Sequence, residues 1–113
     1  MARHSIAVSR ASGDALHVLG NQIRQARIAK GWTVSDTAER LGVDHRTLRA
    51  AEQGSAKVAI GTVFNAAFLL GVDLFGLDQV GLAEARRRGE ATLALLPSRV
   101  RTPRRIDLDA IDF

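Results

Sequence analysis

Apolar residues recur every three or four positions between Gly13 and Lys30, and Gly31 follows directly. This spacing places them on one face of an α-helix, so it predicts a first amphipathic helix that ends at Gly31. Its apolar face would consist of Leu16, Leu19, Ile23, Ala26 and Ile28. The residues before Gly13 show no such pattern and are expected to form a flexible arm.

Residues 33–54 (TVSDTAERLGVDHRTLRAAEQG) predict two short helices joined by a tight turn. Thr33 and Asp36 have the spacing of a capping box at a helix start. Gly42 allows the chain to leave that helix in a left-handed conformation, and Asp44 can cap a second helix that ends at Gly54. This arrangement is a helix-turn-helix.

The same stretch predicts which of its side chains are buried. Val34, Thr37, Ala38 and Leu41 share one face of the first short helix, and Val43 would fill the corner. In the second helix Leu48 and Ala51 point inward, and the remaining surface consists of His45, Arg46, Thr47, Arg49 and Ala50. Trp32, at the preceding corner, is interpreted as a packing residue.

Residues 60–70 (IGTVFNAAFLL) are apolar on nearly every side of a helix. Such a helix needs a second buried face, which is either the rest of the monomer core or a second copy of the chain. A further helix is expected over residues 78–96, ended by Pro97. No Lys or Arg lies between Lys57 and Arg86, which favours a protein contact, so we expect a homodimer formed through residues 60–95.

At 113 residues with 46% apolar content, the chain is expected to form one modest core with tails. The expected fold is all-α, with about five or six helices and flexible N- and C-terminal tails. The expected division is a flexible arm at 1–12, a helix-turn-helix domain at 13–78, a C-terminal helix for dimer or partner contact at 79–97, and a disordered charged tail at 98–113.

Composition excludes several classes of function. The chain has no cysteine, so disulfides and thiolate sites are excluded. His4, His17 and His45 lack metal-ligand spacing, and there is no glycine-rich phosphate loop or serine-histidine-acid set. We expect no metal, no cofactor and no catalysis. No long apolar run or apolar leader is present, so we expect a cytoplasmic protein with no membrane contact.

The positive charge is concentrated in one half of the chain. The net charge is +4, and residues 1–57 hold nine Lys or Arg against five Asp or Glu, whereas residues 58–113 hold seven against seven. Neutralising phosphates releases condensed counterions, so a basic excess around the helix-turn-helix indicates a polyanionic partner.

Four separated segments resemble the phage-repressor-like helix-turn-helix family, often called Xre or Cro. They are RIAKG at 27–31, ERLGV at 39–43, EQG at 52–54 and LLGVDLFGL at 69–77. The resemblance runs from about Leu19 to Leu77 and implies binding of double-stranded operator DNA, with the second short helix in the major groove. The alternative is an ordinary helical bundle with a chance turn.

The resemblance places the base-reading positions on His45, Arg46 and Ala50, with Arg49 in reach of a base or a phosphate. Arg46 could bond O6 and N7 of guanine together, which is worth about 1–3 kcal/mol of discrimination. A plain phosphate contact is the alternative for Arg46, and a surface position without a base contact is the alternative for His45.

Phosphate contacts are expected from Thr33, Thr47 and Lys57. The chain departs from the family at Val34, where a glutamine often clasps the DNA backbone. Arg27 and Glu52 match positions that form a structural salt bridge in the family.

The leading hypothesis is a homodimeric repressor that reads two half-sites about 10 bp apart. The ending of the chain, LALLPSRVR followed by an acidic-apolar run, more weakly resembles autoregulating antitoxins paired with HipA-type kinase toxins. Apolar anchors for such a kinase-like partner would be Ile106, Leu108, Ile111 and Phe113.

Two alternatives stay open: a stand-alone phage-type or chromosomal regulator, and a protein-interaction module without DNA binding. Val34, Asp44 and Ala50 favour the second, while Arg46, Arg49 and Lys57 oppose it.

Overall fold

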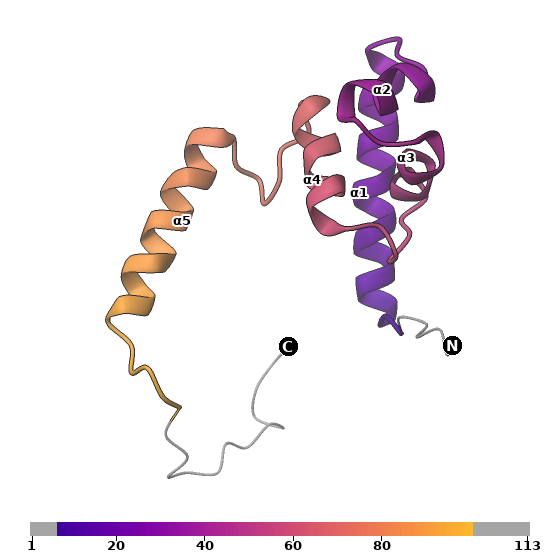
Figure 1. Ribbon diagram of the computed structural model, residues 1–113. Coiled ribbons are helices and arrows are strands. Elements are labelled where there is room, and N and C mark those ends of the chain that lie inside the picture. The colour runs from indigo at the N-terminus through magenta and orange to yellow at the C-terminus, as the bar shows by residue number, and fades with distance from the viewer. Residues whose placement is uncertain (1–6, 101–113) are drawn as a thin grey trace. The chain divides into compact units, whose positions relative to one another are not determined.

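The computed structural model describes residues 7–100, which form five α-helices and no extended strand. The helices are α1 (Arg10–Ala29), α2 (Val34–Leu41), α3 (His45–Glu52), α4 (Ile60–Leu69) and α5 (Gln79–Ala94) (Figure 1). The predicted all-α fold is confirmed. The chain up to Asp78 is one compact unit, and the chain from Gln79 is a second.

Helix α1 begins earlier than the apolar pattern indicates. The Ser9 hydroxyl oxygen accepts a hydrogen bond from the backbone N–H of Ser12 at 3.1 Å, so the helix starts at Arg10 rather than Gly13. Residues 10–12 of the expected arm therefore belong to the helix. Apolar spacing gave no signal there, because residues 10–12 are exposed.

The inward face of α1 also differs at one position from the prediction. Ile23 is fully buried and Leu16, Leu19 and Ala26 are half-buried, as expected, but Ile28 is 57% exposed. Arg27 lies one helical turn after Ile23 and takes the inward place. The assignment of Ile28 to the apolar face was wrong.

Side-chain caps fix the starts of α2 and α3. Thr33 Oγ1 accepts from the backbone N–H of Asp36 at 3.0 Å, and Asp36 Oδ2 accepts from that of Thr33 at 3.3 Å, which completes the capping box. Asp44 Oδ1 accepts from the backbone N–H of Thr47 at 2.7 Å. Gly42, with φ 71°, makes the turn between the two helices. The expected helix-turn-helix is present.

One core joins the first four helices. Helix α3 packs against both α1 and α2, and α2 also contacts α4 (Figure 1). The buried apolar residues are Ile23, Ala38, Leu48, Ala51, Val63, Ala66, Ala67, Leu70 and Leu74. Thr37 is fully buried beside them, and its hydroxyl donates to the Thr33 carbonyl oxygen at 2.9 Å. Helix α3 is therefore anchored on two sides.

Gly54 ends the segment that contains α3 and lies directly against α1. Its φ is 75°, and an added Cβ would lie 2.9 Å from the Cα of His17. A larger residue would meet both a strained backbone and the main chain of α1. Gly54 thus sets how closely the end of α3 approaches α1.

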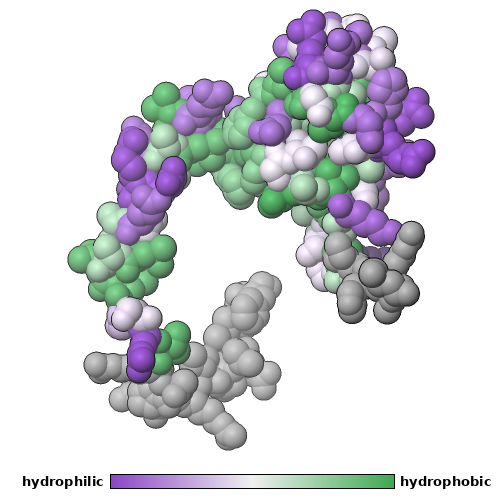
Figure 2. Space-filling view, viewed as in Figure 1, coloured by the Kyte–Doolittle hydropathy of each residue, from purple (hydrophilic) through white to green (hydrophobic). Residues whose placement is uncertain are grey.

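Helix α4 buries only one of its faces within the unit that ends at Asp78. Val63, Ala66 and Ala67 are buried, whereas Ile60 is 70% and Phe68 39% exposed. Figure 2 shows hydrophobic surface over α4 and the segment that follows it, and hydrophilic surface over α2 and α3. The outer face of α4 has no cover within residues 7–78.

Helix α5 lies in the second unit, and none of its side chains is buried. Exposed ion pairs join Arg86 to Glu90 at 2.8 Å and Arg88 to Glu84 at 3.8 Å. The helix ends at Ala94, shortly before Pro97. No helix within residues 7–100 is long and apolar enough to cross a membrane.

Candidate nucleic-acid interface

The outward face of α3 presents the four residues predicted to read bases. His45, Arg46 and Arg49 are exposed and Ala50 is half-buried. Together with Gln53 they line a hollow of about 450 Å³. The short side chain of Ala50 lies between longer neighbours, so this face is open to a ligand.

A second hollow continues from α3 toward the start of α4. It has a volume of about 400 Å³ and is lined by Arg46, Thr47, Ala50, Ser55, Lys57, Val58, Ala59 and Thr62. Thr47 is half-buried and Lys57 is exposed. Arg46 and Ala50 line both hollows, so two of the predicted phosphate residues, Thr47 and Lys57, adjoin the predicted base-reading face.

Thr33 occupies a different place. It is exposed at the start of α2, but its side-chain oxygen takes part in the capping box with Asp36. Its role toward phosphate stays a prediction.

Arg27 and Glu52 form the ion pair that ties α1 to α3. Arg27 Nε lies 2.7 Å from Glu52 Oε2 and Nη2 lies 3.0 Å from Oε1, and the side chains are only 10% and 6% exposed. Arg27 Nη1 also donates to the Trp32 carbonyl oxygen at 2.8 Å. The hydrogen bonds to Glu52 raise the pKa of Arg27, although burial opposes them. The predicted ion pair is therefore present, and its structural role stays a prediction.

Trp32 completes this corner. Its half-buried ring packs against the core, with the Arg40 guanidinium carbon 4.2 Å and Lys30 Nζ 5.3 Å from the ring centroid. Both distances are typical of cation–π contacts. The Trp32 ring thus contacts other residues of the protein, which agrees with its interpretation as a packing residue.

The Asp44 carboxylate is held at the start of α3. Hydrogen bonds from the backbone and side chain of Thr47 lower the pKa of Asp44, with smaller contributions from Arg46 and His45. A negative charge at a helix N-terminus is favourable, so Asp44 serves as a cap.

A helix-turn-helix domain family matches residues 18–85, which is more than half of the chain. The chain belongs to this helix-turn-helix family. No curated protein and no solved structure matches it. Family membership confirms the predicted helix-turn-helix resemblance and points to a DNA-binding regulator, a class that is typically non-enzymatic.

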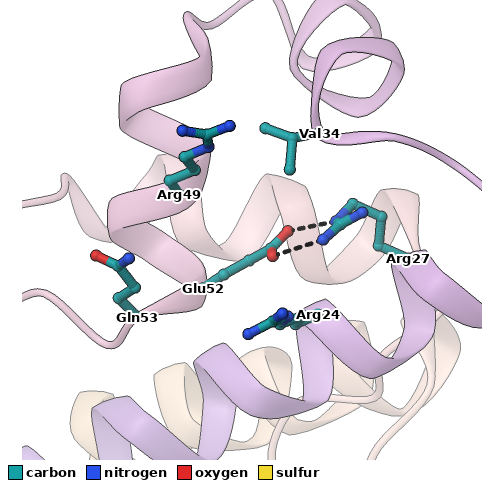
Figure 3. Close-up of a pocket in the computed structure, with 6 residues that line it drawn as sticks. All are labelled: Arg24, Arg27, Val34, Arg49, Glu52 and Gln53. Carbon is teal, nitrogen blue, oxygen red and sulfur yellow. Dashed lines mark hydrogen bonds and ion pairs between the residues drawn. The ribbon is translucent and has the colours of Figure 1, made fainter.

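A third hollow of the helix-turn-helix domain contains two residues, Arg24 and Gln53, to which the sequence analysis assigned no role. It measures about 360 Å³ and is lined by Arg24, Arg27, Val34, Arg49, Glu52 and Gln53 (Figure 3). Arg24 lies one turn before Arg27 on α1, and Gln53, the C-cap residue of α3, follows Arg49 by four residues. Helical spacing from the predicted residues was the available signal.

The structure does not describe the residues that were predicted to bind a partner protein. Ile106, Leu108, Ile111 and Phe113, the predicted partner-binding residues, lie outside the described residues. Within residues 7–100, no group of three or more His, Cys, Asp or Glu side chains is arranged to hold a metal ion.

Proposed function

We propose that the protein is a homodimeric, sequence-specific repressor that inserts α3 into the major groove of operator DNA. The observation that carries this proposal is the uncovered face of α3, where His45, Arg46 and Arg49 are exposed around half-buried Ala50. An α-helix fits the major groove, and residues near its N-terminus reach the base edges.

Within this face Arg46 is the primary base reader. It is exposed in the first turn of α3 and lines both hollows that flank Ala50. Its planar guanidinium matches the paired acceptors of guanine. His45 and Ala50 adjoin it and contribute further base contacts.

Phosphate contacts flank the base-reading face. Lys57 and Thr47 line the hollow on the α4 side, and Thr33 stands at the start of α2. Such contacts fix the register of the protein on the duplex without reading its sequence.

Dimerisation uses the uncovered apolar residues at 60–95. Besides Ile60 and Phe68, Phe75 is 79% exposed. Phe75 has φ 57°, which is unfavourable for a bulky residue, and it lies in a tight turn closed by the Leu77 N–H donating to the Leu74 carbonyl at 3.0 Å. A strained turn that presents an aromatic ring to solvent supports a contact with a second copy of the chain.

A narrower role is autoregulating antitoxin of a type II toxin-antitoxin operon, with a HipA-type kinase toxin as partner. Its support is the tail sequence, in which four apolar residues alternate with aspartates. A stand-alone regulator is the alternative, and it predicts that removing residues 99–113 changes only DNA affinity and its salt dependence. A gene for a kinase-like protein beside this one would favour the antitoxin.

The proposal is tested by measuring binding to the DNA upstream of the protein's own gene at several salt concentrations. Wild type is compared with Arg46→Ala/Arg49→Ala and with a scrambled duplex. Specific binding by wild type alone, weakening steeply with salt, supports the repressor. Equal behaviour of both proteins on both duplexes would instead identify a protein-interaction module.

A further inference from the structure

The hollow between α1, α2 and α3 has an unusual distribution of charge. Three arginines and one glutamate line it, together with Val34 and Gln53. Figure 3 shows Arg24, from α1, and Arg49, from α3, on opposite sides of the Arg27–Glu52 ion pair. The hollow is thus bordered by two guanidinium groups that come from different helices.

Only one of the three arginines is neutralised. The Glu52 carboxylate accepts hydrogen bonds from Arg27 with both oxygens, so the charges of this pair offset each other. Arg24 and Arg49 are exposed, and within residues 7–100 neither side chain has a hydrogen bond or ion pair. Each guanidinium therefore keeps its donors for a ligand. The hollow carries two uncompensated positive charges.

We propose that this hollow, the Arg24–Arg49 hollow, binds one backbone phosphate of the DNA, held between the two guanidinium groups. This inference rests on the proposed function. Arginine is suited to phosphate because its planar fork donates two parallel hydrogen bonds. A phosphate placed between two like charges also relieves their mutual repulsion.

The remaining lining residues fit this ligand. Among the described residues that line the hollow, Glu52 alone is acidic, and its carboxylate oxygens already accept hydrogen bonds from Arg27. Gln53 has an amide that can donate to a phosphate oxygen. Val34, which α2 contributes to the hollow, has no polar side-chain atom. Arg24, from α1, supplies the hydrogen-bond donors that Val34 lacks.

The proposal changes the role of Arg49. This residue lines both the Arg24–Arg49 hollow and the hollow around Ala50. An arginine engaged with a phosphate beside Arg24 has no fork left for a base. Base discrimination in α3 then falls to Arg46 and its neighbours, and Arg49 positions the helix.

The test compares full-length wild type with Arg24→Gln, Arg49→Gln and Arg24→Lys. The matched control is Arg87→Gln, because Arg87 is an exposed arginine of α5. Binding to operator and scrambled duplexes is measured across a salt series. Circular dichroism of each variant verifies folding, which Arg24→Gln should leave intact because Arg24 is exposed.

Removal of a phosphate contact has a characteristic signature. Arg24→Gln and Arg49→Gln should each weaken binding to both duplexes by a similar factor, about tenfold, and leave the ratio between duplexes unchanged. Because each arginine is one of two cations on the same phosphate, the magnitude of the slope of log K against log salt should fall by part of the value for one phosphate, which is about 0.9. Arg24→Lys should keep most of the slope, and Arg87→Gln should match wild type.

Three results would overturn the proposal. If Arg24→Gln leaves the slope of log K against log salt unchanged while wild type still prefers its operator, Arg24 does not contact the DNA. The proposed repressor function is then unaffected. If Arg49→Gln changes the base preference, Arg49 contacts a base and not the proposed phosphate. If wild type binds no duplex, the proposed function fails and this phosphate site fails with it.

Discussion

The backbone of α1 at Gly20 lies against the carbonyl oxygen of Glu52 at the end of α3. A Cβ built on Gly20 would lie 2.5 Å from this oxygen and 2.7 Å from the carbonyl oxygen of Ala51. Both neighbours are main-chain atoms, so they cannot move aside as a flexible side chain would. The absent side chain of Gly20 therefore determines how closely α3 packs on α1.

Gly20→Ala is expected to lower the free energy of unfolding by about 1–3 kcal/mol, because the added methyl group forces α1 and α3 apart. Urea unfolding followed by the fluorescence of the single tryptophan, Trp32, measures the loss. Gly61→Ala is the matched control, since its new Cβ meets nothing within 4 Å on α4. That variant should gain up to about 1 kcal/mol. Equal stability of the two variants would refute the close approach.

Removing one member of the Arg27–Glu52 pair should leave a buried charge without its partner. We expect Arg27→Met alone to cost about 3–5 kcal/mol of unfolding free energy. Arg27→Met/Glu52→Leu should regain much of this loss, although the Trp32 carbonyl still lacks its donor. A double-mutant cycle from urea titrations measures the coupling. Additive losses would show that the two side chains do not act as a pair.

Acid should weaken the fold through Asp36 and Asp44. Hydrogen bonds with Thr33, chiefly its side chain, lower the pKa of Asp36, and those with Thr47, chiefly its backbone, lower the pKa of Asp44. A lowered pKa adds stability that is complete above the unfolded value of about 4 and is lost as the pH falls through the folded value.

Melting temperature measured between pH 7 and pH 2 should therefore decline in this acidic window. Asp44→Asn keeps an N-cap oxygen but does not titrate, so it should decline less steeply. A wild-type melting temperature that rises with acid, or identical pH profiles for the two proteins, would contradict the assignment.

Phe75→Asn should separate folding from self-association. Asparagine tolerates a positive φ better than phenylalanine does, so the turn should persist and the melting temperature should stay close to that of wild type. Loss of the exposed ring, which packs edge-on against Phe64 at 6.3 Å, should weaken the proposed dimer. Sedimentation equilibrium measures the dimer, with Val18→Asn on α1 as an exposed control. A dimer unaffected by Phe75→Asn would place the interface elsewhere.

The sequence was most informative where the structure depends on neighbouring residues. The capping box at Thr33, the Gly42 turn and the Asp44 cap all follow from residues a few positions apart, and each is present. The same local chemistry at Ser9 starts α1 at Arg10, but the expectation rested on apolar spacing and missed it.

Features that depend on distant residues were not predictable in this way. The contact of Gly20 with Glu52 and the position of Arg24 opposite Arg49 require α1 to be packed on α3. Nothing in the spacing of LLGVDLFGL indicates that Phe75 adopts a positive φ in addition to the two glycines of the segment, Gly71 and Gly76. These features depend on tertiary packing, which overrides local preference.

The proposed function requires that α3 reads DNA sequence through Arg46. Selection of bound duplexes from a random pool tests this role, and no operator has to be known beforehand. Wild type should enrich two half-sites about 10 bp apart with a guanine at one position in each. Arg46→Ala should lose the preference at that position and keep the others. Enrichment of the same sequence by both proteins, or of none by wild type, would contradict the claim.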